Sequence, residues 1–393
     1  MISLLLFVGI VGAVFVGFNI GGSSGGVAWG PAVGAGLIKK TSAAALMTGF
    51  AFLGGWTVGR NVIATLAEDI IAVSISLQQG VALLFFIGFG ILLSNLLSVP
   101  VPTSMTTVGA IAGLGLATGQ LNFETIGWIA TWWVVAPFLG FFVGLIIGRH
   151  FYPELNRRFR IASSEGTLLT VDWDGALPTV RLGPNTTPGE VIGTGLVLAV
   201  SCYMAFSAGA SNIPNAVAPL VSSGALDVDA AIIIATVAIG VGAFTIARRT
   251  MESVGTELTD ISLFAALIVM TTAASITAGL SYLGVPISLV MATVMTIAGL
   301  GWGRATRPIA LEDAVRGSLR GEIGVEIALD AVTVDQDPPV AQIGEAEPKK
   351  VLEEAGDLFD QQALARYISM WIVGPSVALA LSYAYFYTGF IGG

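Results

Sequence analysis

Long apolar runs, separated by short polar or glycine-rich segments, recur along almost the whole chain. A helix needs about 20 mainly apolar residues to cross the hydrocarbon core of a bilayer. The pattern therefore predicts an all-α polytopic membrane protein with five transmembrane helices in each half. The predicted spans of the first half are residues 2–20, 43–59, 79–97, 104–118 and 126–148. Those of the second half are residues 191–208, 228–247, 261–281, 286–302 and 367–390.

Two polar stretches interrupt this pattern and define the expected domain organisation. The expected segments are a first transmembrane repeat (1–148), a linker (149–190), the first part of a second repeat (191–302), an acidic loop (303–366) and a final helix (367–393). Within the linker, residues 168–175 and 178–182 favour two short strands joined by an Asp-Gly turn. Both polar stretches are expected in the cytoplasm.

The two halves carry similar motifs in the same order, which indicates an internal repeat. The matching pairs are Trp133-Val134-Val135-Ala136-Pro137 with Trp371-Ile372-Val373-Gly374-Pro375, residues 18–24 with 206–212, and residues 99–102 with 285–288. An odd number of crossings per repeat would invert the second copy relative to the first, as in many secondary transporters. The small-residue segments 21–36 and 209–220 are expected to belong to broken helices or to re-entrant segments.

Basic residues predict the orientation of the chain. With five crossings per half, Lys39, Lys40, Arg248 and Arg249 fall on the same side as both polar stretches, and Arg60 falls on the opposite side. The positive-inside rule places the basic side in the cytoplasm. The expected location is therefore the plasma membrane, with the N- and C-termini outside.

Composition narrows the possible functions. Apolar residues make up 54% of the chain and charged residues 11%, with a net charge of −9. One cysteine, Cys202, and one histidine, His150, exclude a disulfide framework and argue against a metal cluster, and no cofactor is expected. No predicted span holds paired carboxylates, which argues against a membrane enzyme. A receptor signalling through the loop at 303–366 is a weaker alternative, because that loop has no nucleotide-binding motif. Nucleic acid is not expected as a partner, whereas the lipid bilayer is, and a homodimer is compatible with the architecture.

The ordered motifs make the chain resemble the inorganic phosphate transporter (PiT) family. That family has a signature near G-A-N-D-V-A-N-A in each half, a proline element near P-V-S-T-T-H, and a sulfate-permease branch. The second signature is represented here by Gly209-Ala210-Ser211-Asn212-Ile213-Pro214-Asn215-Ala216, and the first, more loosely, by residues 21–28. The proline element corresponds to Pro100-Val101-Pro102-Thr103-Ser104-Met105. The resemblance implies an oxyanion transporter, sodium-coupled in the phosphate branch, that works by alternating access.

Departures from the family pattern lie at its carboxylates. The signature aspartate is replaced by Ser24 in the first half and by Asn212 in the second, while Glu252 is retained. Sulfate is fully ionised and only accepts hydrogen bonds, whereas phosphate keeps a proton that a carboxylate can accept. The acid-free motifs therefore favour sulfate over phosphate, although a carbonyl or Glu252 could accept the phosphate proton.

The sequence leaves two candidates for the coupling ion, H⁺ and Na⁺. Losing both motif aspartates puts sodium coupling in doubt, since carboxylates are usual ligands of bound cations. Glu252 is the candidate proton carrier, with an ion pair to Arg248 as the alternative. An uncoupled anion channel or exchanger that uses the same site is a further alternative.

Hydrogen-bond donors near the motif glycines form the candidate anion site. Small residues allow close backbone approach to an anion, and hydroxyls and amides donate to it. For Gly25 and Ser288, helix packing is an equally good explanation. The predicted substrate-binding residues are Ser23, Ser24, Gly25, Thr103, Ser104, Ser211, Asn212, Asn215 and Ser288.

Overall fold

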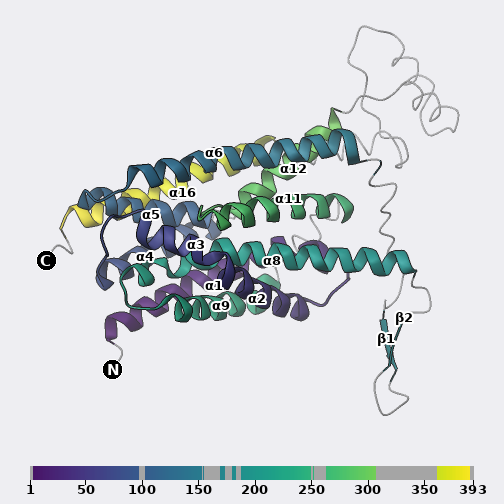
Figure 1. Ribbon diagram of the computed structural model, residues 1–393, viewed down its shortest axis with the longest axis horizontal. Coiled ribbons are helices and arrows are strands. Elements are labelled where there is room, and N and C mark those ends of the chain that lie inside the picture. The colour runs from purple at the N-terminus through teal and green to yellow at the C-terminus, as the bar shows by residue number, and fades with distance from the viewer. Residues whose placement is uncertain are drawn as a thin grey trace, which may run out of the picture.

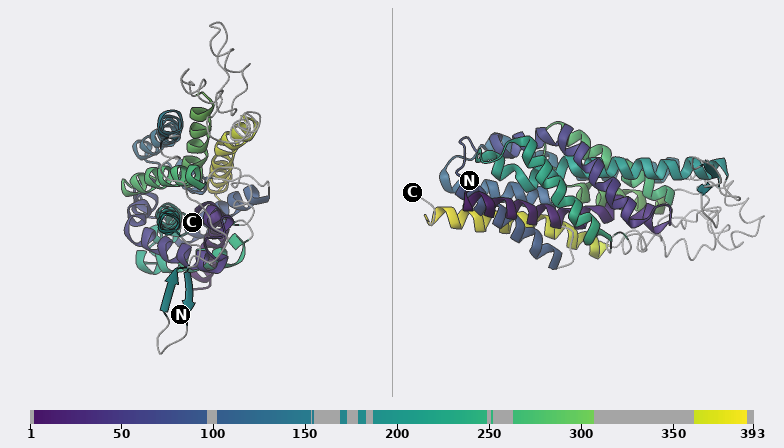
Figure 2. Two further views of the ribbon diagram at one scale, coloured as in Figure 1. Left: turned by 90° about the vertical axis from the view of Figure 1, so that its right-hand side faces the viewer. Right: turned by 90° about the horizontal axis from the view of Figure 1, so that it is seen from below.

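Helices running side by side along one axis make up the main body of the protein (Figure 1, Figure 2). The computed structural model describes residues 3–96, 102–152, 154, 169–172, 179–182, 187–248, 251, 263–306 and 361–389. The first half contains α1 (Leu4–Gly34), α2 (Lys40–Thr57), α3 (Gly59–Ala64), the π-helical turn η1 (Thr65–Asp69), α4 (Leu77–Leu96), α5 (Thr103–Thr118), α6 (Phe123–Ile146) and η2 (Ile147–Phe151). The second half contains α8 (Pro188–Ser222), α9 (Val228–Thr245), α11 (Leu263–Tyr282), α12 (Leu289–Ala305) and α16 (Gln361–Tyr387).

Each of the ten predicted spans corresponds to a helix, but the helices differ in length. Among the described residues, five helices are long and apolar enough to cross a membrane, or six if α2 and α3 with η1 count as one bent span. In contrast, α5 has 16 residues and α12 has 17. At about 1.5 Å per residue they are shorter than the roughly 30 Å of bilayer hydrocarbon. Buried residues lie at the start of each, Ser104 in α5 and Leu289 in α12, so their N-termini lie inside the protein.

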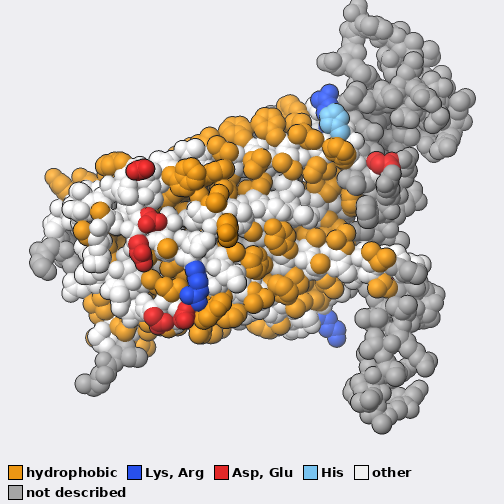
Figure 3. Space-filling model, viewed as in Figure 1, with side chains coloured by type: hydrophobic (Ala, Val, Ile, Leu, Met, Phe, Trp, Pro, Cys, Tyr) orange, Lys and Arg blue, Asp and Glu red, His pale blue; other side chains and the backbone are white. Residues whose placement is uncertain are grey.

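The surface of the helical body suits contact with lipid. Many large apolar side chains are exposed along the helices, including Phe85, Phe138, Val237 and Ile372. On the face seen in Figure 3, hydrophobic side chains are spread over the helical body, and the few charged side chains lie mostly toward its ends. Contiguous exposed apolar surface of this extent marks a membrane interaction.

The glycine-rich motifs do not break their helices, contrary to the expectation for residues 21–36 and 209–220. The helix α1 is continuous over 31 residues and α8 over 35. Close helix contacts explain the small residues, because a side chain at Gly21 would strike the backbone oxygen of Ile239, and one at Gly209 that of Ala51. The broken span lies elsewhere, between α2 and α3, where the helix bends by 61°.

The two halves pack on each other in reciprocal pairs. The helix α1 lies on α9 and α2 lies on α8, while α5 packs on α16 and α12 packs on α6. Glycines at matching positions make these contacts: Gly54 lies against the backbone of Phe206, and Gly242 lies against that of Phe18. The two largest apolar clusters of the core each contain residues of both halves. Neither half therefore has a separate core.

The predicted hairpin in the linker is confirmed. Strand β1 (Leu169–Asp172) pairs antiparallel with β2 (Thr179–Leu182), with Leu169 opposite Leu182 and Asp172 opposite Thr179. The hairpin stands away from the helices (Figure 1). Residues 307–360, which include most of the predicted acidic loop, lie outside the described residues.

Candidate functional site

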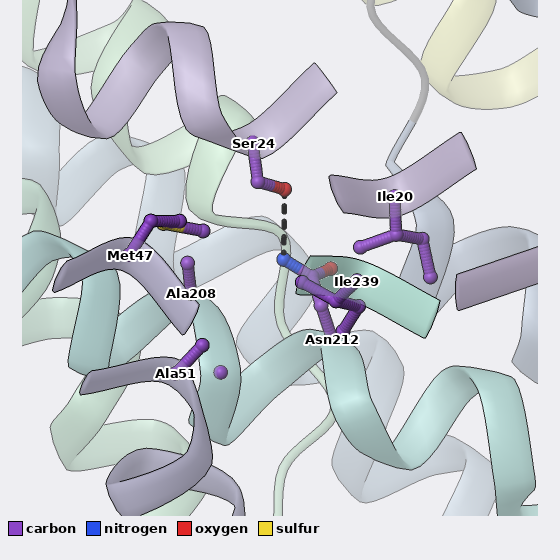
Figure 4. A pocket seen from close by; sticks show the side chains of 8 residues that line it. Ile20, Ser24, Met47, Ala51, Ala208, Asn212 and Ile239 are labelled. Carbon is purple, nitrogen blue, oxygen red and sulfur yellow. Dashed lines mark hydrogen bonds between the residues drawn. The ribbon is translucent and has the colours of Figure 1, made fainter. Parts of the chain in front are cut away.

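Ser24 and Asn212, which replace the two signature aspartates of the family pattern, lie next to each other in space. Ser24 is on α1 and Asn212 is on α8, 188 positions later. The Asn212 Nδ2 donates a hydrogen bond to the Ser24 Oγ at 3.3 Å (Figure 4). Both side chains are buried, with 8% and 6% of their surface exposed. The two motifs of the repeat thus meet at one polar pair.

The N-terminus of α5 extends this pair into a buried polar network. The Thr103 Oγ1 donates to the Asn212 Oδ1 at 2.7 Å. The Asn215 Nδ2, one turn further along α8, lies 3.3 Å from the Thr103 Oγ1 and 3.0 Å from the Ser104 Oγ. The Ser104 Oγ in turn donates to the backbone oxygen of Ile287 at 3.1 Å. The network therefore joins α1, α8, α5 and the segment that precedes α12.

A small pocket adjoins the Ser24–Asn212 pair, between α1, α2, α8 and α9 (Figure 4). Its lining consists of Ile20, Ser24, Met47, Ala51, Ala208, Gly209, Asn212 and Ile239. Three pairs of these residues are each 188 positions apart, namely Ile20 with Ala208, Ser24 with Asn212, and Ala51 with Ile239. The pocket therefore lies where matching positions of the two halves face each other.

The pocket is uncharged and narrow. None of its lining residues is ionisable, and Ser24 and Asn212 are its only polar side chains. The space between the side chains is too tight to hold a water molecule. A molecule as large as water would fit only if the lining side chains or helices moved apart.

The structure joins the side chains of five of the nine predicted site residues in this network, and the other four contribute no side chain to it. The exposed Ser23 donates to the backbone oxygen of Ile20 on its own helix. Gly25 provides room for Ala247 and Met251, and Ser211 donates weakly to the Ala208 oxygen at 3.5 Å. The Ser288 Oγ accepts from the Met291 amide and so caps α12.

Glu252, the predicted proton carrier, lies outside the described residues. Among the described residues, no group of three or more histidine, cysteine, aspartate or glutamate side chains is placed to hold a metal ion. The donors of the pocket are thus a hydroxyl and an amide.

The apolar wall of the pocket was not predicted from the sequence. Met47, Ala51 and Ile239 belong to α2 and α9, which carry no polar motif. The available signal was the repeat itself, since Ala51 and Ile239 are matched positions. Their role depends on α2 packing on α8 and α9 packing on α1, which no local pattern encodes.

Comparisons with known proteins show the family of the chain. A model of the phosphate transporter family matches residues 20–382. Sulfate permease CysP of Bacillus subtilis (strain 168) is 28% identical over 297 residues, which cover 75% of this chain and 77% of the permease. Inorganic phosphate transporter 2-1, chloroplastic, of Arabidopsis thaliana is 23% identical over 403 residues, which cover 79% of this chain and 68% of that protein.

A solved structure described as a sodium-dependent phosphate transporter shares the fold. It has a TM-score of 0.67 at 17% identity, and the match covers 98% of both chains. The apolar helices and the family match together indicate a multi-pass membrane protein. The family model covers well over half of the chain, so this protein belongs to the phosphate transporter family.

Proposed function

We propose that this protein is a secondary-active transporter of a small inorganic oxyanion and prefers sulfate to phosphate. The observation that carries the proposal is the uncharged Ser24–Asn212 pair, which is buried where the two halves meet. An acceptor-only anion needs donors and is repelled by an unpaired carboxylate, so a hydroxyl and an amide suit it. The similarity to a sulfate permease of Bacillus subtilis supports the same preference.

The narrow pocket and the reciprocal packing support alternating access. Because the pocket has no room for a water molecule, transport requires an open state on each side in turn. The paired contacts of α1 with α9 and of α2 with α8 support two inverted repeats that rock against each other. We further propose that the basic ends of the helices face the cytoplasm of a plasma-membrane protein, with cation-coupled symport as the driving mechanism.

Radiolabelled sulfate uptake into proteoliposomes tests the proposal. We expect accumulation that depends on an imposed inward pH or sodium gradient and that excess phosphate inhibits weakly. The variant Asn212→Asp should lose sulfate uptake, because a carboxylate would face the anion. The matched control is Thr131→Val, since the exposed Thr131 hydroxyl bonds only within α6.

Three results would count against parts of the proposal. Equilibration without accumulation under either gradient would indicate a channel or exchanger. Sodium-driven phosphate uptake that ignores sulfate would refute the substrate preference. Unchanged sulfate uptake by Asn212→Asp would remove Asn212 from the site.

A further inference from the structure

We propose that Thr103 and Asn215 are positioning residues that hold the Asn212 amide with its NH₂ group toward the pocket, so that this amide offers an anion donors and no acceptor. This inference rests on the proposed function, because it explains how the site would distinguish a proton-free oxyanion from one that carries a proton. It also changes the roles expected from the sequence, where Thr103 and Asn215 were both candidate ligands. Neither residue lines the pocket.

The orientation of Asn215 is set by groups that accept hydrogen bonds. Its Nδ2 lies 3.1 Å from the backbone oxygen of Ser211, which is an acceptor only. The Ser104 hydroxyl directs its single proton to the Ile287 oxygen, so toward Asn215 it acts as an acceptor at 3.0 Å. The NH₂ group of Asn215 therefore faces Ser211, Ser104 and Thr103, which share its two protons, and the side chain is fully buried in that position.

Thr103 transmits this orientation to Asn212. Its hydroxyl accepts from the Asn215 Nδ2 at 3.3 Å and has one proton to give. The Asn212 Oδ1, at 2.7 Å, receives that proton in the shortest side-chain bond of the network. The amide oxygen of Asn212 is thus held against α5, and its Nδ2 faces Ser24 across the pocket (Figure 4).

The result is a pocket into which the Asn212 amide presents donors and no acceptor. Because Ser24 accepts from Asn212, its own hydroxyl proton is free to point at an anion, as is the second Nδ2 proton of Asn212. The other lining side chains are apolar. Sulfate has only acceptor oxygens and fits such a site. Hydrogen phosphate would find no amide oxygen for its O–H, but only the Ser24 hydroxyl oxygen that already accepts from Asn212, and a poorly paired buried donor is penalised.

Removing the Thr103 hydroxyl should free the Asn212 amide to rotate and present its oxygen to the pocket. The ratio of sulfate to phosphate affinity, measured by competition for uptake into proteoliposomes, should then fall about tenfold in Thr103→Val, the effect of about one hydrogen bond. The variant Thr103→Ser keeps the hydroxyl and should retain the wild-type ratio. Thr131→Val, which loses a hydroxyl bonded within α6, should also retain it.

A ratio that stays unchanged in Thr103→Val while uptake of both anions falls equally would show a merely structural role and overturn the proposal. A similar loss of selectivity in Thr103→Ser would also overturn it, because the hydroxyl is retained there. If the valine variant does not fold, Thr103→Ala removes the same hydroxyl without adding volume, and the same criteria apply.

The same assay separates this inference from the proposed function. A wild-type protein that moves neither anion, or that prefers phosphate, refutes the proposed function and the inference together. A wild-type protein that prefers sulfate, combined with an unchanged ratio in Thr103→Val, refutes the inference alone.

Discussion

The contact between α2 and α8 depends on the missing side chain of Gly54, so Gly54→Ala should weaken it measurably. A methyl group there would lie 2.8 Å from the carbonyl carbon of Phe206 and 2.9 Å from the amide nitrogen of Ala210. Ordinary contacts of this kind are about 3.5–4.0 Å, so the helices must separate by roughly 1 Å. The obstructing atoms are backbone and cannot rotate away, which places the cost near the upper end of the 1–3 kcal/mol typical of overpacking.

Gly49→Ala on the same helix is the matched control. Nothing lies within 4 Å of the position that its methyl group would occupy. Both substitutions gain the same helix propensity, about 1 kcal/mol. That gain cancels in the comparison, so Gly54→Ala should be about 3 kcal/mol less stable than Gly49→Ala. Against the wild type, the expected changes are a loss of about 2 kcal/mol for Gly54→Ala and a gain of up to about 1 kcal/mol for Gly49→Ala.

Equilibrium unfolding of the purified protein in mixed detergent micelles, followed by tryptophan fluorescence, measures this difference. The variant Gly242→Ala, at the matching contact of α9 with α1, should lose a similar amount, since its methyl group would strike the backbone of Phe18. Equal stability of Gly54→Ala and Gly49→Ala would refute the reasoning, because it would mean that α2 and α8 do not approach this closely.

Two further predictions concern contacts between the halves. Arg60 donates to Asp229 at 2.6 Å and so links the bent span to α9. The substitution Arg60→Glu should slow transport up to about fivefold, which corresponds to an ion pair of about 1 kcal/mol, and the added substitution Asp229→Arg should restore the rate. Uptake that the second substitution does not improve would contradict this prediction. The Trp133 Nε1 donates to the Pro286 oxygen at 2.8 Å, so Trp133→Phe should lower the free energy of unfolding by about 1 kcal/mol. Trp128→Phe, at a half-exposed position on the same helix, should lower it little. Equal losses in the same unfolding assay would contradict the role of this hydrogen bond.

Sequence patterns predicted the helices well, because lipid permits few alternatives. A backbone in hydrocarbon must satisfy its own hydrogen bonds, so a long apolar run in this composition becomes a helix. The Asp-Gly turn likewise predicted the hairpin of β1 and β2. The position of the broken span was predicted wrongly. Glycines at 21–26 and 209 indicated a break, yet they mediate close helix contacts, and the bend lies at Val58 instead.

The residues of the candidate site were likewise predicted only in part. The repeat pointed to Ser24 and Asn212 as matched positions, and the structure places them in contact. The same reasoning grouped Ser23 with Ser24, although Ser23 turns outward and bonds to its own helix. Adjacent residues on a helix face different directions, so sequence proximity to a motif does not establish membership of a site.

The sequence by itself determined that the chain is a doubled bundle of apolar helices whose two matched motifs lack carboxylates, since hydropathy and residue identity are local properties. Only the tertiary structure decided that α5 approaches α8 so that Thr103 donates to Asn212, and that the polar pair adjoins a narrow, mainly apolar pocket. The direction of a hydrogen bond depends on which acceptors surround each group. Those neighbours come from helices more than a hundred residues apart in the chain, and their approach is fixed by the packing of the two halves.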